Sequence, residues 1–379
     1  MGKPIDSVPR CFLVLGMSHG GLFQARQLRR HWPDAKIYGV GKAGDAGRSS
    51  RVLDHFFVAE TAGEIDAVIR KIAGREDAVC AYLCSNPMLE TAVFVHPEWF
   101  SLLSFENAPD VYRRLVDKAE MAALCRECGV PFPAEYPLDE LSAITFPAVV
   151  KPATKERTLG ASKCAVFSDV PSLVSYLDKL ESKGVRRDDL YCQQAVAGDN
   201  RWEYGYGGFF ADGVPVLDIC FHQFRQQPQG LCCYVREMTD TVLAARLRAM
   251  VSPILEKTRY SGFLEFDVKQ DSRTGDLYLL DVNPRPWRSV DMLLPKLGDS
   301  SVFQPILHDV KVVWRYPYRE LLGRKNKLNP SYRACRKLAH GPMKTQWALY
   351  DPMDRRPFAS QARMDWKDYS GRIKKHFCK

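Results

Sequence analysis

The sequence has 379 residues with 46% hydrophobic and 26% charged side chains, which predicts a globular protein of two or three subdomains around a shared cleft and excludes extended disorder. No apolar run reaches the roughly 20 residues of a membrane-spanning helix, and the N-terminus lacks the apolar core of a signal peptide, so we expect a cytoplasmic protein. The net charge of +9 is concentrated near the C-terminus, where residues 313–379 carry +12 and the rest of the chain carries −3.

The first segment of the chain predicts a βαβ unit. An unbroken apolar strand over Cys11–Leu15 is followed by a glycine-rich turn and a helical pattern over Leu22–His31. A strand without polar alternation is typical of a parallel sheet that is buried on both faces. The alternation continues through strand Lys36–Val40, helix Glu64–Ala73 and strand Ala78–Cys84. We therefore expect an N-terminal α/β domain with a parallel sheet.

The glycine-rich turn at residues 16–21 does not have the GxGxxG spacing of a dinucleotide site. The second strand also ends in Gly39-Val40-Gly41-Lys42, without the acidic residue that would bind a ribose. These two features argue against NAD. The glycines either bring backbone close to a ligand or make a tight strand-to-helix turn, and we favour the turn.

A helical pattern from about Asp110 to Cys128 follows a domain boundary and ends at Gly129, before Pro131 and Pro133. Its Cys125 and Cys128 have CxxC spacing, but no second pair of Cys or His follows. The 12 cysteines are scattered through apolar stretches, so we interpret them as reduced thiols rather than disulfides or zinc ligands.

After Pro147 the pattern becomes rich in strands and predicts an α+β region. Two helices, Val170–Ser182 and Thr241–Lys257, interrupt it. The predicted strands are Ala148–Lys151, Lys163–Phe167, Tyr191–Val196, Gly205–Phe210, Val214–Cys220, Gly262–Gln270 and Leu277–Asn283.

The last two strands read as a β-hairpin with polar residues on one face. Because side chains alternate along a strand, Glu265, Asp267 and Lys269 share one face of the first strand. Asp281, Asn283 and Arg285 likewise share one face of the second. Carboxylate and amide oxygens on paired strands suit Mg²⁺ that bridges nucleotide phosphates. The alternative is a sheet face whose charged residues meet water.

The run Asp281-Val282-Asn283-Pro284-Arg285 resembles the metal-binding E-x-N-x-R strand of the ATP-grasp superfamily. Further segments resemble that superfamily in the expected order. Asp117-Lys118, which opens a helix that ends at Gly129–Pro133, resembles its first ATP lysine. Lys151 in Phe146–Pro152 resembles the second. A small-residue loop through Gly160-Ala161-Ser162 follows, and Cys192–Asp199 resembles the hinge strand that holds adenine and ribose.

The resemblance covers roughly residues 10 to 310 and implies an ATP-grasp fold, α/β and α+β, behind an N-terminal Rossmann-like pre-ATP-grasp domain. Ser49-Ser50-Arg51 and Phe57-Val58 resemble the second half of that N-terminal domain. We expect the pre-ATP-grasp domain at 1–108, the ATP-grasp domain at 109–312 with a lid at about 130–200, and a basic C-terminal extension at 313–379.

The resemblance also implies roles for single residues. Gln193 would meet the adenine amino group, Val196 would offer backbone polar groups to the ring, and Asp199 would reach the ribose, with Gln194 in the same strand. Arg225 and Arg285 would face the transferred phosphoryl group. The metal ligands would be Asp281 and Asn283 with Asp267 or Glu265, of which we rank Asp267 first. Asp281 departs from the usual Glu and is one methylene shorter.

The resemblance is greatest to carboxylate-amine ligases of the D-aspartate ligase and carbamoyl-phosphate-synthase large-chain type. It implies an enzyme that uses ATP and Mg²⁺ or Mn²⁺ to convert a carboxylate into an acyl phosphate, which an amine captures to give an amide, ADP and phosphate. The alternatives are a carboxylating enzyme resembling biotin carboxylase or the carbamoyl-phosphate type, and a catalytically silent ATP-binding protein.

The C-terminal extension contains 17 Lys and Arg against 5 Asp and Glu, interspersed with Trp314, Tyr316, Trp347 and Trp366. A basic segment binds nucleic acid or an acidic partner, or packs on the rest of the chain. We favour packing, or contact with a partner protein or a second copy of the chain, over nucleic acid. The small-molecule partners are the carboxylate and amine substrates, whose identities the sequence leaves open.

Overall fold

The computed structural model describes residues 11–153, 164–227, 231–323, 327, 329–331 and 342–377. The chain folds into two compact units. Unit 1 comprises residues 1–106, 285–321 and 342–379, and unit 2 comprises residues 107–284 and 322–341. The chain therefore leaves unit 1 before the predicted ATP-grasp domain and returns to it after Pro284. The small-residue loop expected at Gly160–Ser162 lies outside the described residues.

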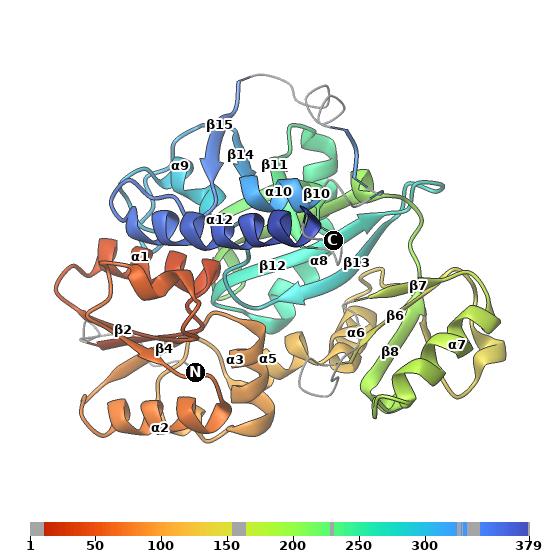
Figure 1. Cartoon of the computed structure of the whole chain (residues 1–379), viewed down its shortest axis with the longest axis horizontal. Helices are drawn as coiled ribbons and strands as arrows, with labels where there is room; N and C mark the ends of the chain where they lie inside the picture. The colour runs from red at the N-terminus through yellow and green to blue at the C-terminus, as the bar shows by residue number, and fades with distance from the viewer. Residues whose placement is uncertain are drawn as a thin grey trace. The chain divides into compact units, whose positions relative to one another are not determined.

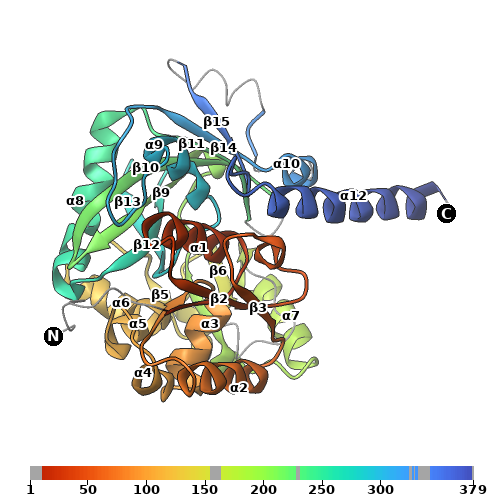
Figure 2. The same ribbon diagram turned by 90° about the vertical axis from the view of Figure 1, so that its left-hand side faces the viewer.

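Unit 1 contains a four-stranded parallel sheet in the order β3-β2-β1-β4. All five residues of β1 are buried, because helices cover both faces of the sheet. Figures 1 and 2 show α1 and α2 on opposite sides of the strands. The elements are β1 (Cys11–Leu15), α1 (His19–His31), β2 (Lys36–Gly41), β3 (His55–Val58), α2 (Ala62–Ala73), β4 (Val79–Leu83), α3 (Asn86–Glu90) and α4 (Trp99–Leu102).

The glycine-rich turn joins β1 to α1 and leaves no space for side chains. Gly16 has a φ of +92°, a conformation that glycine adopts without strain. A Cβ on Gly21 would lie 2.0 Å from the Gly16 carbonyl oxygen, and one on Gly20 would lie 2.5 Å from the Pro286 carbonyl oxygen. The three glycines are thus required by the tight turn and by close packing within unit 1.

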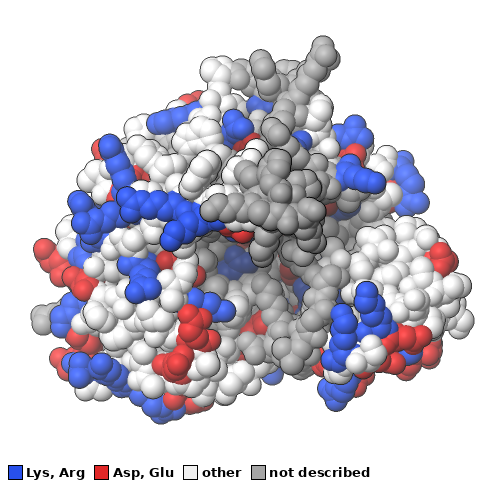
Figure 3. Space-filling view, viewed as in Figure 1, with Lys and Arg blue, Asp and Glu red and all other residues white. Residues whose placement is uncertain are grey.

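Residues 313–321 and 342–377 pack into unit 1. The strands β14 (Val312–Arg315) and β15 (Lys344–Trp347) are parallel, and they accompany α9 (Leu294–Leu297), α10 (Pro317–Gly323) and α12 (Arg356–Phe377). Figure 3 shows Lys and Arg side chains gathered where α12 begins. Arg355, Arg356 and Arg363 are exposed there.

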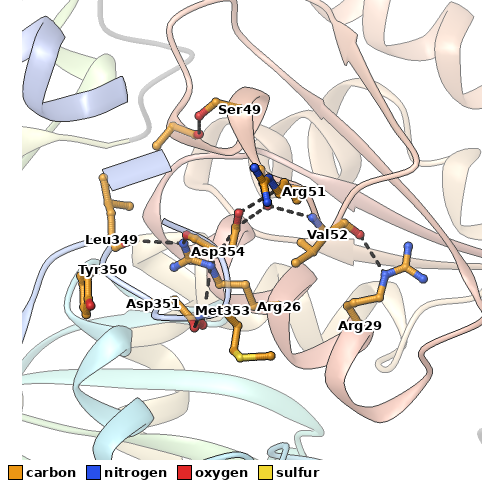
Figure 4. A network of polar contacts seen from close by, with 12 residues as sticks. Arg26, Arg29, Ser49, Arg51, Val52, Leu349, Tyr350, Asp351, Met353 and Asp354 are labelled. Carbon is orange, nitrogen blue, oxygen red and sulfur yellow. Dashed lines mark hydrogen bonds and ion pairs between the residues drawn. The ribbon is translucent and has the colours of Figure 1, made fainter. Parts of the chain in front are cut away.

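A buried ion-pair network ties this C-terminal segment to α1 (Figure 4). Arg26 is 1% exposed, and its guanidinium donates to the Asp354 carboxylate over 3.2 Å and to the Leu349 carbonyl over 3.1 Å. The Asp354 carboxylate also accepts hydrogen bonds from Ser50 Oγ and Arg51 N. Arg30 pairs with Asp351 over 2.7 Å. The network holds together residues that are more than 300 positions apart in the sequence.

Unit 2 is built on five neighbouring antiparallel strands in the order β13-β12-β9-β10-β11. Helix α8 (Thr241–Thr258) lies along one face and buries Leu247, Val251 and Ile254. The strands are β9 (Glu203–Ala211), β10 (Val214–Gln226), β11 (Cys232–Glu237), β12 (Gly262–Gln270) and β13 (Leu277–Asn283). The hairpin β12–β13 has the predicted bounds, whereas β10 extends six residues beyond its predicted end at Cys220 and the sequence analysis missed β11.

The segment predicted to be the lid has its own small sheet and core. Its strands run in the order β5-β8-β6-β7, and α7 packs beside them over a core that includes Leu173, Leu177 and Cys192. The elements are β5 (Glu135–Tyr136), β6 (Ala148–Pro152), β7 (Ala165–Phe167), α7 (Val170–Glu181) and β8 (Leu190–Gln194).

The single helix predicted from about Asp110 to Cys128 is wrong, because the structure has two helices there. These are α5 (Pro109–Val116) and α6 (Lys118–Glu127). Asp117 between them has extended backbone, and its carboxylate accepts hydrogen bonds from the N–H groups of Ala119 and Glu120. Aspartate is a strong helix N-cap because its carboxylate satisfies such free N–H groups. Lys118 is therefore the first residue of a new helix.

Candidate nucleotide and metal site

The four acidic and amide side chains of the hairpin lie on one face of unit 2. Asp267 pairs with Asp281 and Glu265 pairs with Asn283, and residues directly opposite each other in an antiparallel pair point to the same face. Helix α8 covers the other face, where its Arg248 lies over the Tyr206 ring. The carboxylates therefore point away from α8.

The Asn283 amide joins the two acidic residues of β12. Its Nδ2 donates to Glu265 Oε2 and to Asp267 Oδ2, both over 3.2 Å. Glu265 and Asn283 are 8% and 6% exposed, whereas the Asp281 side chain is 38% exposed, so the Glu265–Asn283 end of the cluster is withdrawn from water. Burial makes electrostatic contacts stronger and leaves a charge costly unless a partner neutralises it.

Two lysines from other elements supply positive charge to this cluster. Lys118 Nζ at the start of α6 lies 3.3 Å from Asp281 Oδ1. Lys151 on β6 donates from Nζ to Gln193 Oε1. Burial and the Lys118 charge lower the pKa of Lys151 to about 8, while Asp281 and Asp267 oppose the shift. Lys151 thus lies within the electrostatic reach of Lys118 and both aspartates.

The predicted hinge residues lie at the end of β8. Gln193 is 1% exposed, and its Nε2 is buried without a hydrogen-bond partner among the residues that the structure describes. The N–H of Gln194 donates to the Ala134 carbonyl. Val196 follows the strand and is partly buried. The Asp199 carboxylate forms an ion pair with Arg201 over 2.9 Å and caps the short turn that follows. If Asp199 binds a ribose, it does so while it is paired with Arg201.

The two arginines predicted to face the phosphoryl group lie in different surroundings. Arg225 is 5% exposed on β10 and donates to the Pro330 carbonyl in unit 2. The prediction that Arg285 continues the β13 face is wrong, because β13 ends at Asn283. Pro284 has no N–H to extend the ladder, and Arg285 lies in unit 1, where its Nε donates to Asn86 Oδ1.

The sequence analysis missed two contributors to the carboxylate face. Gln223 Nε2 donates to Asp267 Oδ1 over 2.6 Å. Gly205 of β9 lies opposite both Asp267 and Phe221, and a Cβ there would lie 2.3 Å from the Phe221 ring. The signals were the Gly205-Tyr206-Gly207-Gly208 run and the alternation of His222-Gln223-Phe224-Arg225 beyond Cys220.

The donor set fits a divalent ion with a preference for oxygen ligands. Asp267, Asp281 and Asn283 offer carboxylate and amide oxygens, which suit Mg²⁺ or Mn²⁺. Among the described residues, the group of three carboxylate or imidazole side chains whose ligand atoms lie within 4.8 Å of one another is elsewhere, at Asp66, His96 and Glu98. Arg70 already pairs with Asp66 and Glu98, so that cluster is neutralised by a protein cation.

Comparison with known proteins bears on this arrangement. No family model matches the chain. The sequence is 23% identical to D-aspartate ligase of Enterococcus faecium over 197 residues, which are 47% of this chain and 46% of the ligase. It is 28% identical to D-alanine–D-alanine ligase B of Xanthomonas campestris over 167 residues, which are 40% of this chain and 47% of that ligase. The chain thus matches about half the length of these curated relatives.

The fold comparison extends over more of the molecule. The structure matches the ADP complex of PurK, an N5-carboxyaminoimidazole ribonucleotide synthetase, with a TM-score of 0.59. The match covers 78% of this chain and 76% of PurK at 12% identity. The chain has the ATP-grasp fold, and about half of it resembles two ligases in sequence. The predicted ATP-grasp fold with an N-terminal Rossmann-like sheet is confirmed, whereas a basic C-terminal extension as a separate part stays a prediction.

Both curated relatives are ligases by name, and the PurK structure is an ADP complex. Of the helices in the described part of the chain, none has the length and apolar character that a bilayer crossing requires.

Proposed function

We propose that the protein is a carboxylate-amine ligase that uses Mg-ATP to form an amide through an acyl phosphate. The observation that supports it is the convergence of Lys118, Lys151, Asp267 and Asp281 from four elements of unit 2. Two lysines beside two carboxylates match the needs of phosphoryl transfer, where charge neutralisation and alignment provide most of the rate enhancement.

Each polar residue of the site has a proposed role. Asp267, Asp281 and Asn283 would hold the divalent ion, which when bound neutralises charge on the phosphates. Lys118 and Lys151 would bind phosphate oxygens. The free Nε2 of Gln193 would donate a hydrogen bond to a ring nitrogen of the adenine, because an amide nitrogen is a donor and the Oε1 is held by Lys151. This assignment replaces our expectation that Gln193 meets the adenine amino group.

The proposed reaction needs no protein nucleophile. The substrate carboxylate attacks the γ-phosphorus and the bond to the ADP oxygen breaks. The amine then attacks the acyl carbon of the acyl phosphate, inorganic phosphate leaves, and the amine loses a proton. The segment at about 130–200 would act as a lid that keeps water from hydrolysing the acyl phosphate.

A second candidate is a carboxylating enzyme that activates bicarbonate. The name of the structural neighbour PurK, a carboxyaminoimidazole ribonucleotide synthetase, favours this possibility, because carboxylation of an amine is also capture of an activated carboxylate by nitrogen. The ligase is preferred because both curated relatives join amino acids, according to their names. The third candidate is a protein that binds ATP without hydrolysing it. Such a protein could keep the Lys118–Asp281 ion pair.

One assay separates the three candidates. Phosphate release is followed with Mg-ATP and mixtures of carboxylic acids and amino acids, with bicarbonate either present or removed. A ligase requires both an acid and an amine, a carboxylating enzyme requires bicarbonate, and a silent protein binds Mg-ATP without turnover. Binding is checked by a thermal shift with Mg-ATP alone.

The residue assignment is tested in the same assay. We expect Asp281→Ala and Asn283→Ala each to abolish ADP formation with circular dichroism unchanged. Lys151→Ala should mainly weaken ATP binding. Asp276→Ala is the matched control, because it removes an exposed carboxylate from the turn of the same hairpin. Full turnover in all three site variants would show that the assignment is wrong.

A further inference from the structure

The last residues of β10 extend past the neighbouring strand β9. Within the described part of the chain, the ladder between the two strands ends at the pair His222–Tyr204, although β10 continues to Gln226. Gln226 is 6% exposed. Buried backbone N–H and C=O groups are almost always hydrogen-bonded, so this stretch of β10 requires partners other than β9.

The side-chain amide of Asn329 provides these partners at Gln226. Asn329 Oδ1 accepts from Gln226 N over 2.9 Å, and Asn329 Nδ2 donates to the Gln226 carbonyl over 2.6 Å. An amide that bonds both backbone groups of one residue takes the place of a residue in a neighbouring strand. Asn200, which is 2% exposed, donates from Nδ2 to the same Asn329 Oδ1 over 2.6 Å. Three hydrogen bonds therefore fix Asn329 against the end of β10.

Asn329 belongs to unit 2 although it lies in the C-terminal part of the sequence. The chain leaves unit 1 after Leu321 and returns to it at Pro342, and residues 322–341 between them are part of unit 2. The next residue, Pro330, is buried, and its carbonyl accepts a hydrogen bond from the Arg225 guanidinium. Asn329 and Pro330 thus bind two consecutive residues of β10, one through its backbone and the other through its side chain.

Arg225 lies on the face of β10 that carries the metal-site carboxylates. His222 and Phe224 share the other face, because their rings stack with centroids 3.7 Å apart. Since side chains alternate along a strand, Gln223 and Arg225 lie together, and Gln223 donates to Asp267 Oδ1 over 2.6 Å. The register between β10 and β11 shifts on both sides of Arg225. Such irregularities redirect side chains, so the direction of the guanidinium depends on local contacts.

We propose that Asn329 is a positioning residue, which holds the end of β10 so that Arg225 stays directed toward the transferred phosphoryl group. The proposal rests on the ligase function proposed above and on the expected role of Arg225. Cations stabilise the charge of a phosphoryl group during transfer, and a displacement of about 1 Å can lower the rate about 100-fold. Because Asn329 acts through β10, its loss should lower kcat and leave the KM for ATP nearly unchanged.

A double-mutant cycle tests whether Asn329 acts through Arg225. In the ligase assay, we expect Asn329→Ala to lower kcat about 10- to 100-fold and to change the KM for ATP less than about twofold. In an Arg225→Lys background, which keeps the charge but loses the guanidinium, the same change should lower kcat by a factor at least about threefold smaller. Equal factors in the two backgrounds would overturn the proposal.

Controls separate positioning from stability. Lys327→Ala changes an exposed side chain of the same segment and should keep the wild-type kcat. Circular dichroism gives the folded fraction of each variant at the assay temperature. If Asn329→Ala is unfolded there, the cycle is repeated with Asn329→Ser, whose hydroxyl can still donate or accept one hydrogen bond. A loss of activity equal to the loss of folded protein, or a KM for ATP that rises as much as kcat falls, would assign Asn329 a structural role and overturn the proposal.

The two proposals fail in distinguishable ways. If turnover requires an acid and an amine and Asn329→Ala has the wild-type kcat, the positioning role fails and the ligase function stands. If phosphate release requires bicarbonate instead, the ligase function fails, and the same cycle applied to that reaction decides the role of Asn329. If the wild type releases no phosphate with any mixture, both proposals fail, because no phosphoryl group is transferred.

Discussion

Lys151 combines burial with a role that requires charge. Its pKa falls to about 8 because burial and Lys118 both disfavour the ammonium form. Between pH 8 and the ordinary lysine range, the unfolded chain binds more protons than the folded one, so this lysine makes the unliganded protein more stable as pH rises through that window. At neutral pH the buried ammonium group of Lys151 therefore lowers the free energy of unfolding, and this charged form is the one that can bind phosphate.

We predict that Mg-ATP binding weakens as Lys151 loses its proton. If only the ammonium form binds phosphate, the Kd rises about twofold at pH 8 and about tenfold at pH 9 relative to pH 6.5. Isothermal titration calorimetry from pH 6.5 to 9.5 measures this change. Lys151→Arg stays charged and should give a flatter profile, whereas parallel profiles for the two proteins would refute the prediction.

The choice between Asp267 and Glu265 as metal ligand is a second question about single residues. Asp267 lies opposite Asp281 in the hairpin, while Glu265 lies opposite Asn283. The Glu265 carboxylate accepts a hydrogen bond from the Asn283 amide. The Gln223 amide also holds Asp267, as a partner that orients a metal ligand would. These contacts are consistent with ranking Asp267 first, which stays a prediction.

We predict that Asp267→Asn raises the Mg²⁺ concentration for half-maximal turnover by about 10- to 100-fold, more than Glu265→Gln does. Both changes keep the side-chain size and remove one negative charge. Titration of Mg²⁺ at saturating ATP gives the comparison. A larger effect from Glu265→Gln would exchange the two roles.

At the scale of elements, the break at Asp117 positions a site residue. An uninterrupted helix would continue past Lys118, whereas the N-cap starts α6 at that residue and brings its ammonium group 3.3 Å from Asp281. The aspartate thus acts on the site through the helix that it begins.

We predict that Asp117→Ala lowers the free energy of unfolding by about 1 kcal/mol and also weakens Mg-ATP binding. Asp117→Ser, which keeps a capping oxygen, should restore both properties. Urea unfolding and calorimetric titration measure them. If Asp117→Ala binds Mg-ATP as tightly as the wild type, the cap does not position Lys118.

At the scale of the whole molecule, unit 1 is made of segments from both ends of the described chain. The Arg26 network joins α1 to residues 349–354, so the C-terminal segment contributes to the stability of the Rossmann-like domain. Replacing one partner of a buried ion pair leaves the other charge uncompensated.

We predict that Arg26→Met lowers the free energy of unfolding by about 3–5 kcal/mol, because Asp354 loses its buried guanidinium and Asp351 a neighbouring one. Arg363→Met is the control on the exposed face of α12. Guanidinium chloride unfolding, followed by circular dichroism, measures the difference. A variant as stable as the control would mean that the network adds no net stability.

The sequence alone determined the elements whose signals are local. The hairpin Gly262–Gln270 and Leu277–Asn283, the strand Cys11–Leu15 and the ordered set of lysine and acidic motifs were all predicted, because strand alternation and turn residues depend on near neighbours. The ATP-grasp fold was expected from the resemblance of those motifs and is confirmed.

Only the tertiary structure decided the contacts between distant segments. The Gln223–Asp267 bond, the position of Arg285 beside Asn86 and the packing of residues 349–354 on Arg26 each depend on groups that the sequence does not place together. A residue pattern fixes which face a side chain occupies, but its partner is fixed by how separate elements pack. Hydrogen bonds and ion pairs act over a few ångströms, so the roles of these residues became visible only after the chain had folded.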